Sequence, residues 1–97
     1  MAKVKFLKPN AEPVVFDLEG DEVTVGRRAG NAIVVDSGHV SGEHAVFRRD
    51  PETGAFTLTD LGSSNGTEVN GALIKSSELN DGDTILFGEI VARFELN

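Results

Sequence analysis

The 97-residue chain is the size of one domain with a modest core, and we expect residues 1–97 to form a single unit. Sixteen acidic residues against nine lysines and arginines give a formal net charge of −7. This charge argues against non-specific binding to DNA or RNA and against docking on anionic membranes, because both ligands are polyanions.

Two absences narrow the class of protein further. The chain has no cysteine, which excludes disulfides, thiolate metal sites and a cysteine nucleophile. Its longest apolar run, residues 32–35, is far shorter than a membrane span, and its basic N-terminus lacks the apolar stretch of a signal peptide. We therefore expect a cytoplasmic protein.

Alternating apolar and polar residues predict a series of short, half-buried strands. In chain order the clearest of these segments are 14–18, 23–25, 56–59 and 90–96. Asn-Gly and Asp-Gly pairs between them favour tight turns. The best helical candidate, residues 76–79, extends over one turn at most. Many short strands at close spacing predict an all-β antiparallel sandwich or barrel.

Three segments lack a clear strand pattern: 27–31, 36–42 and 62–67. Binding residues on a rigid β scaffold usually lie on such loops. In the first loop, Arg27 and Arg28 directly follow a predicted strand. An arginine held there can bind two oxygens of a phosphate, although a solvated surface charge is the commoner role.

The second loop carries Ser41 and His44. A hydroxyl beside backbone N–H groups can bind an anion, and a serine beside a histidine can also form a nucleophile and its base. No strand–turn–helix elbow surrounds Ser41, so we expect no enzyme and no catalytic residue. His44 begins an apolar stretch, which favours a buried, hydrogen-bonded histidine that ties loops together.

The third loop contains Ser63, Ser64 and Asn65. Such residues usually form turns by bonding their own backbone, but an exposed amide also suits recognition of a peptide main chain. Metal binding fits poorly, because His39 and His44 lack a third ligand and no calcium loop is present. We expect no metal and no cofactor.

Together and in this order, these motifs resemble a forkhead-associated (FHA) domain. The resemblance rests on Val25-Gly26-Arg27, Asn31-Ala32-Ile33-Val34, Val40-Ser41-x-x-His44-Ala45, Asp60-Leu61-x-Ser63-Ser64-Asn65-Gly66-Thr67-x-Val69-Asn70-Gly71 and Leu79-x-Asp81-Gly82-Asp83-x-Ile85-x-Phe87-Gly88. It implies a sandwich of two twisted, mainly antiparallel sheets with the binding loops at one end.

The resemblance also implies a function: a phosphothreonine-dependent protein- or peptide-binding module in Ser/Thr kinase signalling. Its partner would be a threonine-phosphorylated protein or peptide. Arg27, Ser41 and Ser64 would then bind the phosphate, and Asn65 would bind the peptide backbone beside it. We expect the chain to act as a monomer.

Four further residues match family positions that shape the loops: Gly26, His44, Gly66 and Asn70. Two others depart from the pattern. Many members carry a basic residue directly after the loop serine, where this chain has Gly42 followed by Glu43. Because neither supplies positive charge, the resemblance makes Arg27 the main positive charge of the site. Arg28 and Lys75 are further candidate cations, but the sequence does not place them at the site.

The residues leave two alternatives open. The acidic charge, Gly42 and Glu43 motivate a phosphate-independent interaction or assembly domain that uses a sheet face or edge. A hydrolase that uses Ser41 and His44 is the weakest hypothesis, because catalytic triads are recognised by geometry and not by such spacing.

Overall fold

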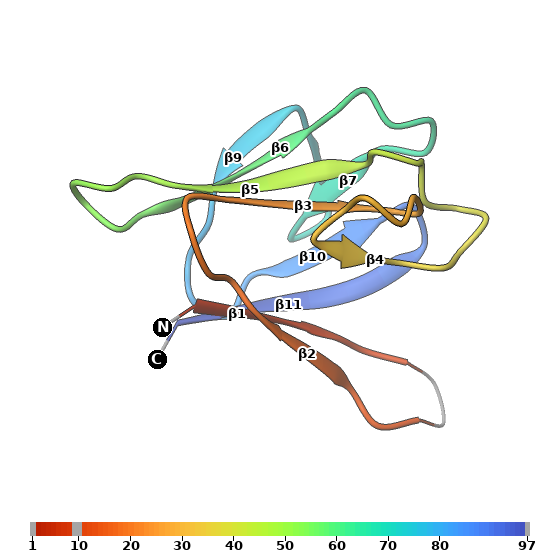
Figure 1. Ribbon diagram of the computed structural model, residues 1–97, viewed down its shortest axis with the longest axis horizontal. Coiled ribbons are helices and arrows are strands. Elements are labelled where there is room, and N and C mark those ends of the chain that lie inside the picture. Colours follow the sequence, from red (N-terminus) through yellow and green to blue (C-terminus); the bar gives the residue numbers. More distant parts are fainter. Residues whose placement is uncertain (1, 9–10, 97) are drawn as a thin grey trace.

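Two β-sheets packed face to face make up the computed structural model, which describes residues 2–8 and 11–96 (Figure 1). The first sheet contains β1 (Ala2–Phe6), β2 (Val14–Asp17), β7 (Thr67–Val69), β8 (Ala72–Ile74), β10 (Thr84–Phe87) and β11 (Ile90–Leu96). The second contains β3 (Glu22–Gly26), β4 (Ile33–Val34), β5 (Ala45–Arg49), β6 (Phe56–Asp60) and β9 (Ser76–Glu78).

Nearly all strand pairs are antiparallel. The first sheet has the order β2-β1-β11-β10-β7-β8 and the second β4-β3-β5-β6-β9. Only β3 and β4 pair in parallel, among the strands of the described ranges. This arrangement confirms the predicted all-β sandwich of mainly antiparallel sheets.

Alternation within the strands fills the space between the sheets. In β1, Ala2, Val4 and Phe6 are buried, whereas Lys3 and Lys5 lie between them on the more exposed face. The Phe87 ring of the first sheet lies 5.9 Å from that of Phe6 and 6.2 Å from that of Phe47 in the second sheet. Aromatic rings from both sheets therefore share one core.

The best helical candidate of the sequence, residues 76–79, contains a strand and no helical turn. Residues Ser76–Glu78 form strand β9, which pairs with β6 in the register Thr57↔Glu78 and Thr59↔Ser76. The Oγ1 of Thr59 lies 3.1 Å from Ser76 Oγ. Pairing with a distant strand decides the conformation here, because local propensity over three residues is weak.

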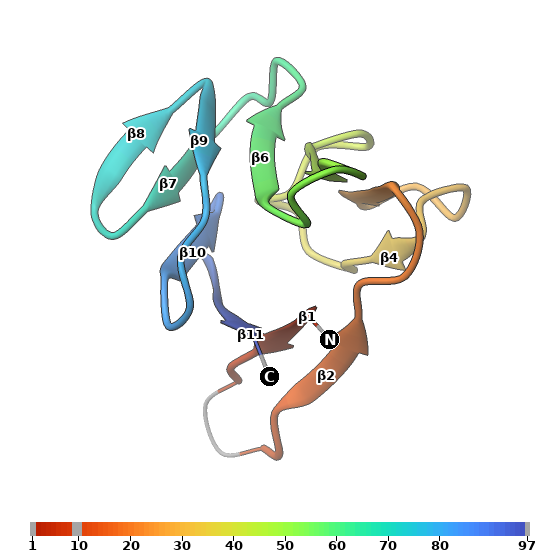
Figure 2. The same cartoon turned by 90° about the vertical axis from the view of Figure 1, so that its left-hand side faces the viewer.

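The three predicted loops lie at one end of the sandwich. Figure 1 shows the β3–β4, β4–β5 and β6–β7 connections gathered at the right, opposite the start of β1 and the end of β11. In Figure 2, β2 and β4, each the outermost strand at one edge of its sheet, lie on the same side of the sandwich.

Replacing Gly26 with alanine should disturb this loop end. A Cβ at Gly26, the last residue of β3, would lie 2.2 Å from Gly42 O and 2.7 Å from Asn31 Nδ2. We expect Gly26→Ala to lower the free energy of unfolding by about 1–3 kcal/mol, measured by urea denaturation.

Gly30→Ala is the matched control, because a Cβ at Gly30 would meet no atom within 4 Å apart from its own residue and its two chain neighbours. It should change the free energy of unfolding by less than about 1 kcal/mol. Equal stability of the two variants would contradict the requirement for a glycine at Gly26.

Candidate functional site

Backbone hydrogen bonds join the first two loops residue by residue. Arg27 N donates to Ser41 O at 2.9 Å, and Arg28 N donates to Gly42 O at 3.1 Å. Asn31 Nδ2 also donates to Gly42 O at 2.7 Å. The β3–β4 loop therefore runs beside the β4–β5 loop and brings Arg27 next to Ser41.

The β6–β7 loop completes the cluster. Ser64 N donates to Ser41 Oγ at 3.0 Å, and Asn65 Nδ2 donates to His39 O at 2.8 Å. Because Ser41 Oγ accepts this bond, its hydroxyl proton is available to a ligand. The structure thus gathers Arg27, Ser41, Ser64 and Asn65 at one end of the sandwich.

His44 connects the same loops from below. Its side chain is fully buried, and its ring packs edge-on against Phe87 at 5.8 Å. Ser41 N donates to its Nδ1 at 3.1 Å, and its Nε2 lies 2.9 Å from Gly66 O. Because Nδ1 accepts the hydrogen bond from Ser41 N and Gly66 O can only accept, the ring carries its proton on Nε2 and donates it to Gly66 O.

This geometry also bears on the hydrolase hypothesis. The ring nitrogens of His44 bond backbone atoms of Ser41 and Gly66, while Ser41 Oγ bonds Ser64 N. Neither nitrogen is therefore free to take a proton from the Ser41 hydroxyl, as a catalytic base must.

Asp60, at the end of β6, organises the β6–β7 loop. Its carboxylate accepts hydrogen bonds from Gly62 N at 2.9 Å, Ser63 N at 3.0 Å and Thr67 Oγ1 at 2.7 Å, and from Ser63 Oγ. Burial raises the pKa of Asp60, but the hydrogen bonds from Ser63, Thr67 and Gly62 outweigh it and hold the pKa below its ordinary value.

The sequence analysis assigned no role to Asp60. Its position three residues before Ser63 is nevertheless typical of an aspartate whose side chain stabilises a turn by bonding the backbone that follows. Ser63 Oγ extends this hydrogen-bond network, because it accepts a hydrogen bond from Gly66 N at 3.0 Å. The carboxylate thus shapes the segment that carries Ser64 and Asn65.

Gly66 and Asn70 occupy turns at the two ends of β7. Gly66 has a φ of 86°, and a Cβ there would lie 2.7 Å from Leu73 Cδ1. Asn70 has a φ of 51°, and its side chain bonds Asp83 Oδ1 and Thr84 N at 2.9 Å each. Asn70 therefore fixes β7 against β10, at the end of β7 that lies away from Ser64.

The charges around the cluster are mixed. Arg27 and Arg28 are exposed, and neither takes part in the ion pairs formed by residues 2–8 and 11–96. Glu43 is exposed on the Ser41 loop. His39 Nδ1 lies 2.8 Å from a carboxylate oxygen of Glu89.

Metal-binding clusters and membrane-spanning helices are both absent from the described ranges. These ranges hold no group of three or more His, Asp or Glu side chains that could bind a metal ion. Within these ranges, no helix has the length and apolar character needed to cross a membrane.

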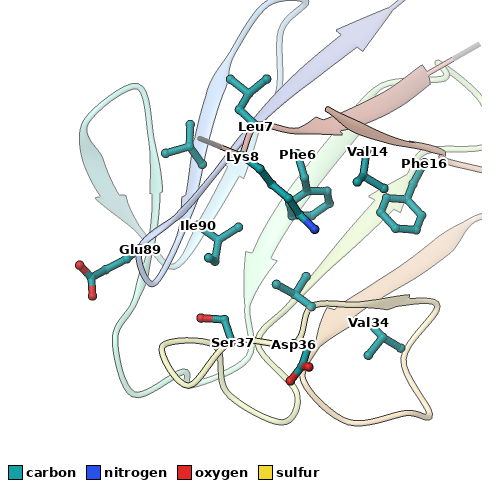
Figure 3. A pocket seen from close by; sticks show the side chains of 12 residues that line it. Phe6, Leu7, Lys8, Val14, Phe16, Val34, Asp36, Ser37, Glu89 and Ile90 are labelled. Carbon is teal, nitrogen blue, oxygen red and sulfur yellow. The ribbon is translucent and has the colours of Figure 1, made fainter. Parts of the chain in front are cut away.

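An apolar groove, which sequence reasoning missed, lies between β2 and β4. It has a volume of about 630 Å³. Figure 3 shows the Phe6 and Phe16 rings on one side, with Asp36 and Ser37 across from them. Val34 on the edge strand β4 also lines it and is 45% exposed. Arg27, Ser41, Ser64 and Asn65 are not among its lining residues.

Comparison with known proteins agrees with this architecture. The family model for the FHA domain matches residues 23–88. An oxoglutarate dehydrogenase inhibitor from Corynebacterium diphtheriae is 39% identical over 74 residues, which is 76% of this chain and 50% of that protein. The chain therefore spans about half the length of this relative.

Two solved structures share the fold. An FHA domain studied for its phosphothreonine-dependent interactions matches with a TM-score of 0.86 and 25% identity, over 99% of this chain and 96% of the other. Mycobacterium tuberculosis EmbR, in complex with a low affinity phosphopeptide, matches with a TM-score of 0.83 and 34% identity, over 97% of this chain and 24% of EmbR.

The hydrogen bonds of Asp60 should make stability depend on pH. The pKa of Asp60 is lower in the folded chain than its ordinary 3.8, so its stabilisation is complete above about pH 5 and is lost as the pH falls through 3.8 and below. We expect Asp60→Asn to lower the free energy of unfolding at pH 7 by about 1–2 kcal/mol.

The measurement is urea denaturation at pH 7 and pH 3, where the difference from the unmodified chain should shrink. Asp17→Asn on the exposed edge strand β2 serves as the control. A difference for Asp60→Asn that stays constant with pH would contradict this role.

Proposed function

Because this chain belongs to the FHA domain family, we propose that it binds a threonine-phosphorylated protein or peptide in Ser/Thr kinase signalling. The observation that carries the proposal is that Arg27 and Ser64 both lie against Ser41. Arg27 N donates to Ser41 O at 2.9 Å, and Ser64 N donates to Ser41 Oγ at 3.0 Å. The FHA domain with phosphothreonine-dependent interactions and the EmbR complex with a phosphopeptide support it.

In this proposal each residue has a defined role. A phosphothreonine carries close to two negative charges and three acceptor oxygens. The Arg27 guanidinium and the hydroxyls of Ser41 and Ser64 bind the phosphate. The Asn65 side chain, whose Nδ2 already bonds His39 O, offers its carbonyl oxygen to the main chain of the peptide.

The net charge of the chain makes short-range donors essential. A charge of −7 repels a phosphopeptide, but salt screens this repulsion over about 10 Å. Attraction must then come from oriented groups at contact distance. A relative that is named an inhibitor supports a binding role, and we propose that the chain catalyses no reaction.

The proposal covers the whole chain as one monomeric unit in the cytoplasm. The FHA match ends at residue 88 and begins at residue 23, yet β1 and β11 pair with each other outside these limits. Val4 and Phe94 from these strands are fully buried in the shared core. This packing supports treating residues 1–97 as a single FHA unit.

Arg27→Ala should weaken phosphate-dependent binding strongly. Loss of one charge-assisted contact weakens binding by about tenfold to a hundredfold. The measurement is an NMR titration with a peptide library that has a fixed central phosphothreonine, with shifts expected at the loops of Arg27, Ser41 and Asn65.

Two controls make this test specific. The same library with unphosphorylated threonine should not bind. Arg49→Ala removes an equal charge from the far end of β5, where Arg49 pairs with Asp21 at 3.4 Å, and should bind as the unmodified chain does. Equal binding of both libraries, or no effect of Arg27→Ala, would disprove the proposal.

The groove between β2 and β4 favours a second candidate function, a phosphate-independent assembly contact with another copy of the chain. Val34 and Val14 are 45% and 37% exposed at the facing edges of the two sheets. Exposed edge strands beside apolar surface are a common route to association.

Light scattering on a concentration series separates the two functions. We expect a monomer at all concentrations, as the phosphopeptide proposal assumes. A dimer that Val34→Asp disrupts and Arg27→Ala leaves intact would instead support the assembly function.

A further inference from the structure

Arg28 lies directly over Gly42, the residue that follows Ser41. A Cβ at Gly42 would lie 2.8 Å from Arg28 Nε, 3.1 Å from Cγ and 3.2 Å from Cδ. The arginine side chain therefore occupies the space that a side chain at position 42 would fill.

The backbone holds the two residues in this position. Arg28 N donates to Gly42 O at 3.1 Å. Asn31 Nδ2 donates both to Arg28 O at 2.9 Å and to Gly42 O at 2.7 Å, which clamps the two loops together. The start of the Arg28 side chain is thus fixed beside the Ser41 loop, while the residue as a whole remains exposed to solvent.

We propose that Arg28 is a second phosphate-binding cation and that Gly42 is required to make room for it. This inference rests on the proposed phosphopeptide function and deepens it. It assigns to the site one residue more than the four that the motifs indicate, and it gives a reason for the glycine after Ser41.

The charge balance of the site calls for a second cation. The phosphate of phosphothreonine brings close to two negative charges, and Arg27 supplies one positive charge. Glu43 adds a further exposed carboxylate to the same loop. With Arg28 present, two guanidinium groups face the dianion, and each can bind phosphate oxygens in a bidentate manner.

Arg28 is also available for this role. Arg48 and Arg49 each pair with an acidic side chain, Glu22 at 3.0 Å and Asp21 at 3.4 Å. Arg28 takes part in none of the ion pairs that the described part of the chain forms. A ligand would therefore break no existing ion pair when it recruits Arg28.

The backbone gives no other reason for a glycine at position 42. The glycines with positive φ in the described ranges include Gly66 and Gly88 but not Gly42. An alanine could adopt this conformation, and its methyl group would meet the Arg28 side chain. Space for Arg28, and not a special turn, thus accounts for Gly42.

A double-mutant cycle tests the inference, with a phosphothreonine peptide selected from the degenerate library as the probe. We expect Arg28→Gln to weaken binding about tenfold, because one charge-assisted contact is lost. Gly42→Ala keeps the charge but displaces Arg28, so it should weaken binding several-fold.

The combined variant identifies the mechanism. If Gly42→Ala acts by moving Arg28, then Arg28→Gln with Gly42→Ala should bind within about twofold of Arg28→Gln alone, since contacting residues are not additive. A second readout is the ³¹P NMR titration of the bound peptide. The pKa of the bound phosphate should be lower in the unmodified chain than in Arg28→Gln, because a nearby cation favours the dianion.

Arg49→Gln is the matched control for the loss of one positive charge and should change neither readout. Unaltered binding by Arg28→Gln, or additive losses in the cycle, would overturn the inference. Failure of the unmodified chain to bind any phosphopeptide would instead overturn the proposed function, whereas binding that depends on Arg27 and not on Arg28 would overturn only the role of Arg28.

Discussion

The loop end of the sandwich depends on the two hydrogen bonds of one buried ring. A neutral imidazole has one acceptor and one donor, so His44 fits only between a backbone N–H and a backbone carbonyl. Ser41 N and Gly66 O supply these partners from two different loops. Loss of either bond would leave a polar group unpaired in the core, which is costly. The ring therefore sets the distance at which Ser41 and Ser64 meet.

Around this centre, the polar side chains divide into two groups. The side chains of His44, Asp60 and Asn31 form hydrogen bonds to other protein groups, and these bonds hold the loops in place. Arg27 and Arg28 remain exposed beside them. An acidic chain can bind an anion under this division, because rigid loops carry the oriented donors and no long-range attraction is needed.

Particular residues show how far the sequence could be interpreted before the structure was known. The alternation in 56–59 and 90–96 indicated strands, and β6 and β11 confirm them. The ordered loop motifs indicated the FHA family, which the match over 23–88 confirms. Residues 76–79, the best helical candidate in the sequence, instead contain strand β9, because these residues acquire their conformation by pairing with β6. The roles of the individual site residues stay predictions.

The sequence by itself determined the alternation of buried and exposed residues, the turns and the chemical groups on each loop, since these are local properties of the chain. Tertiary structure alone decided which groups lie together. Arg28 stands fourteen positions before Gly42 in the sequence, and only the pairing of two loops brings its side chain over that glycine. The groove between β2 and β4 likewise exists only because two sheets leave their outer strands facing each other. Such contacts join distant segments, and no short stretch of sequence encodes them.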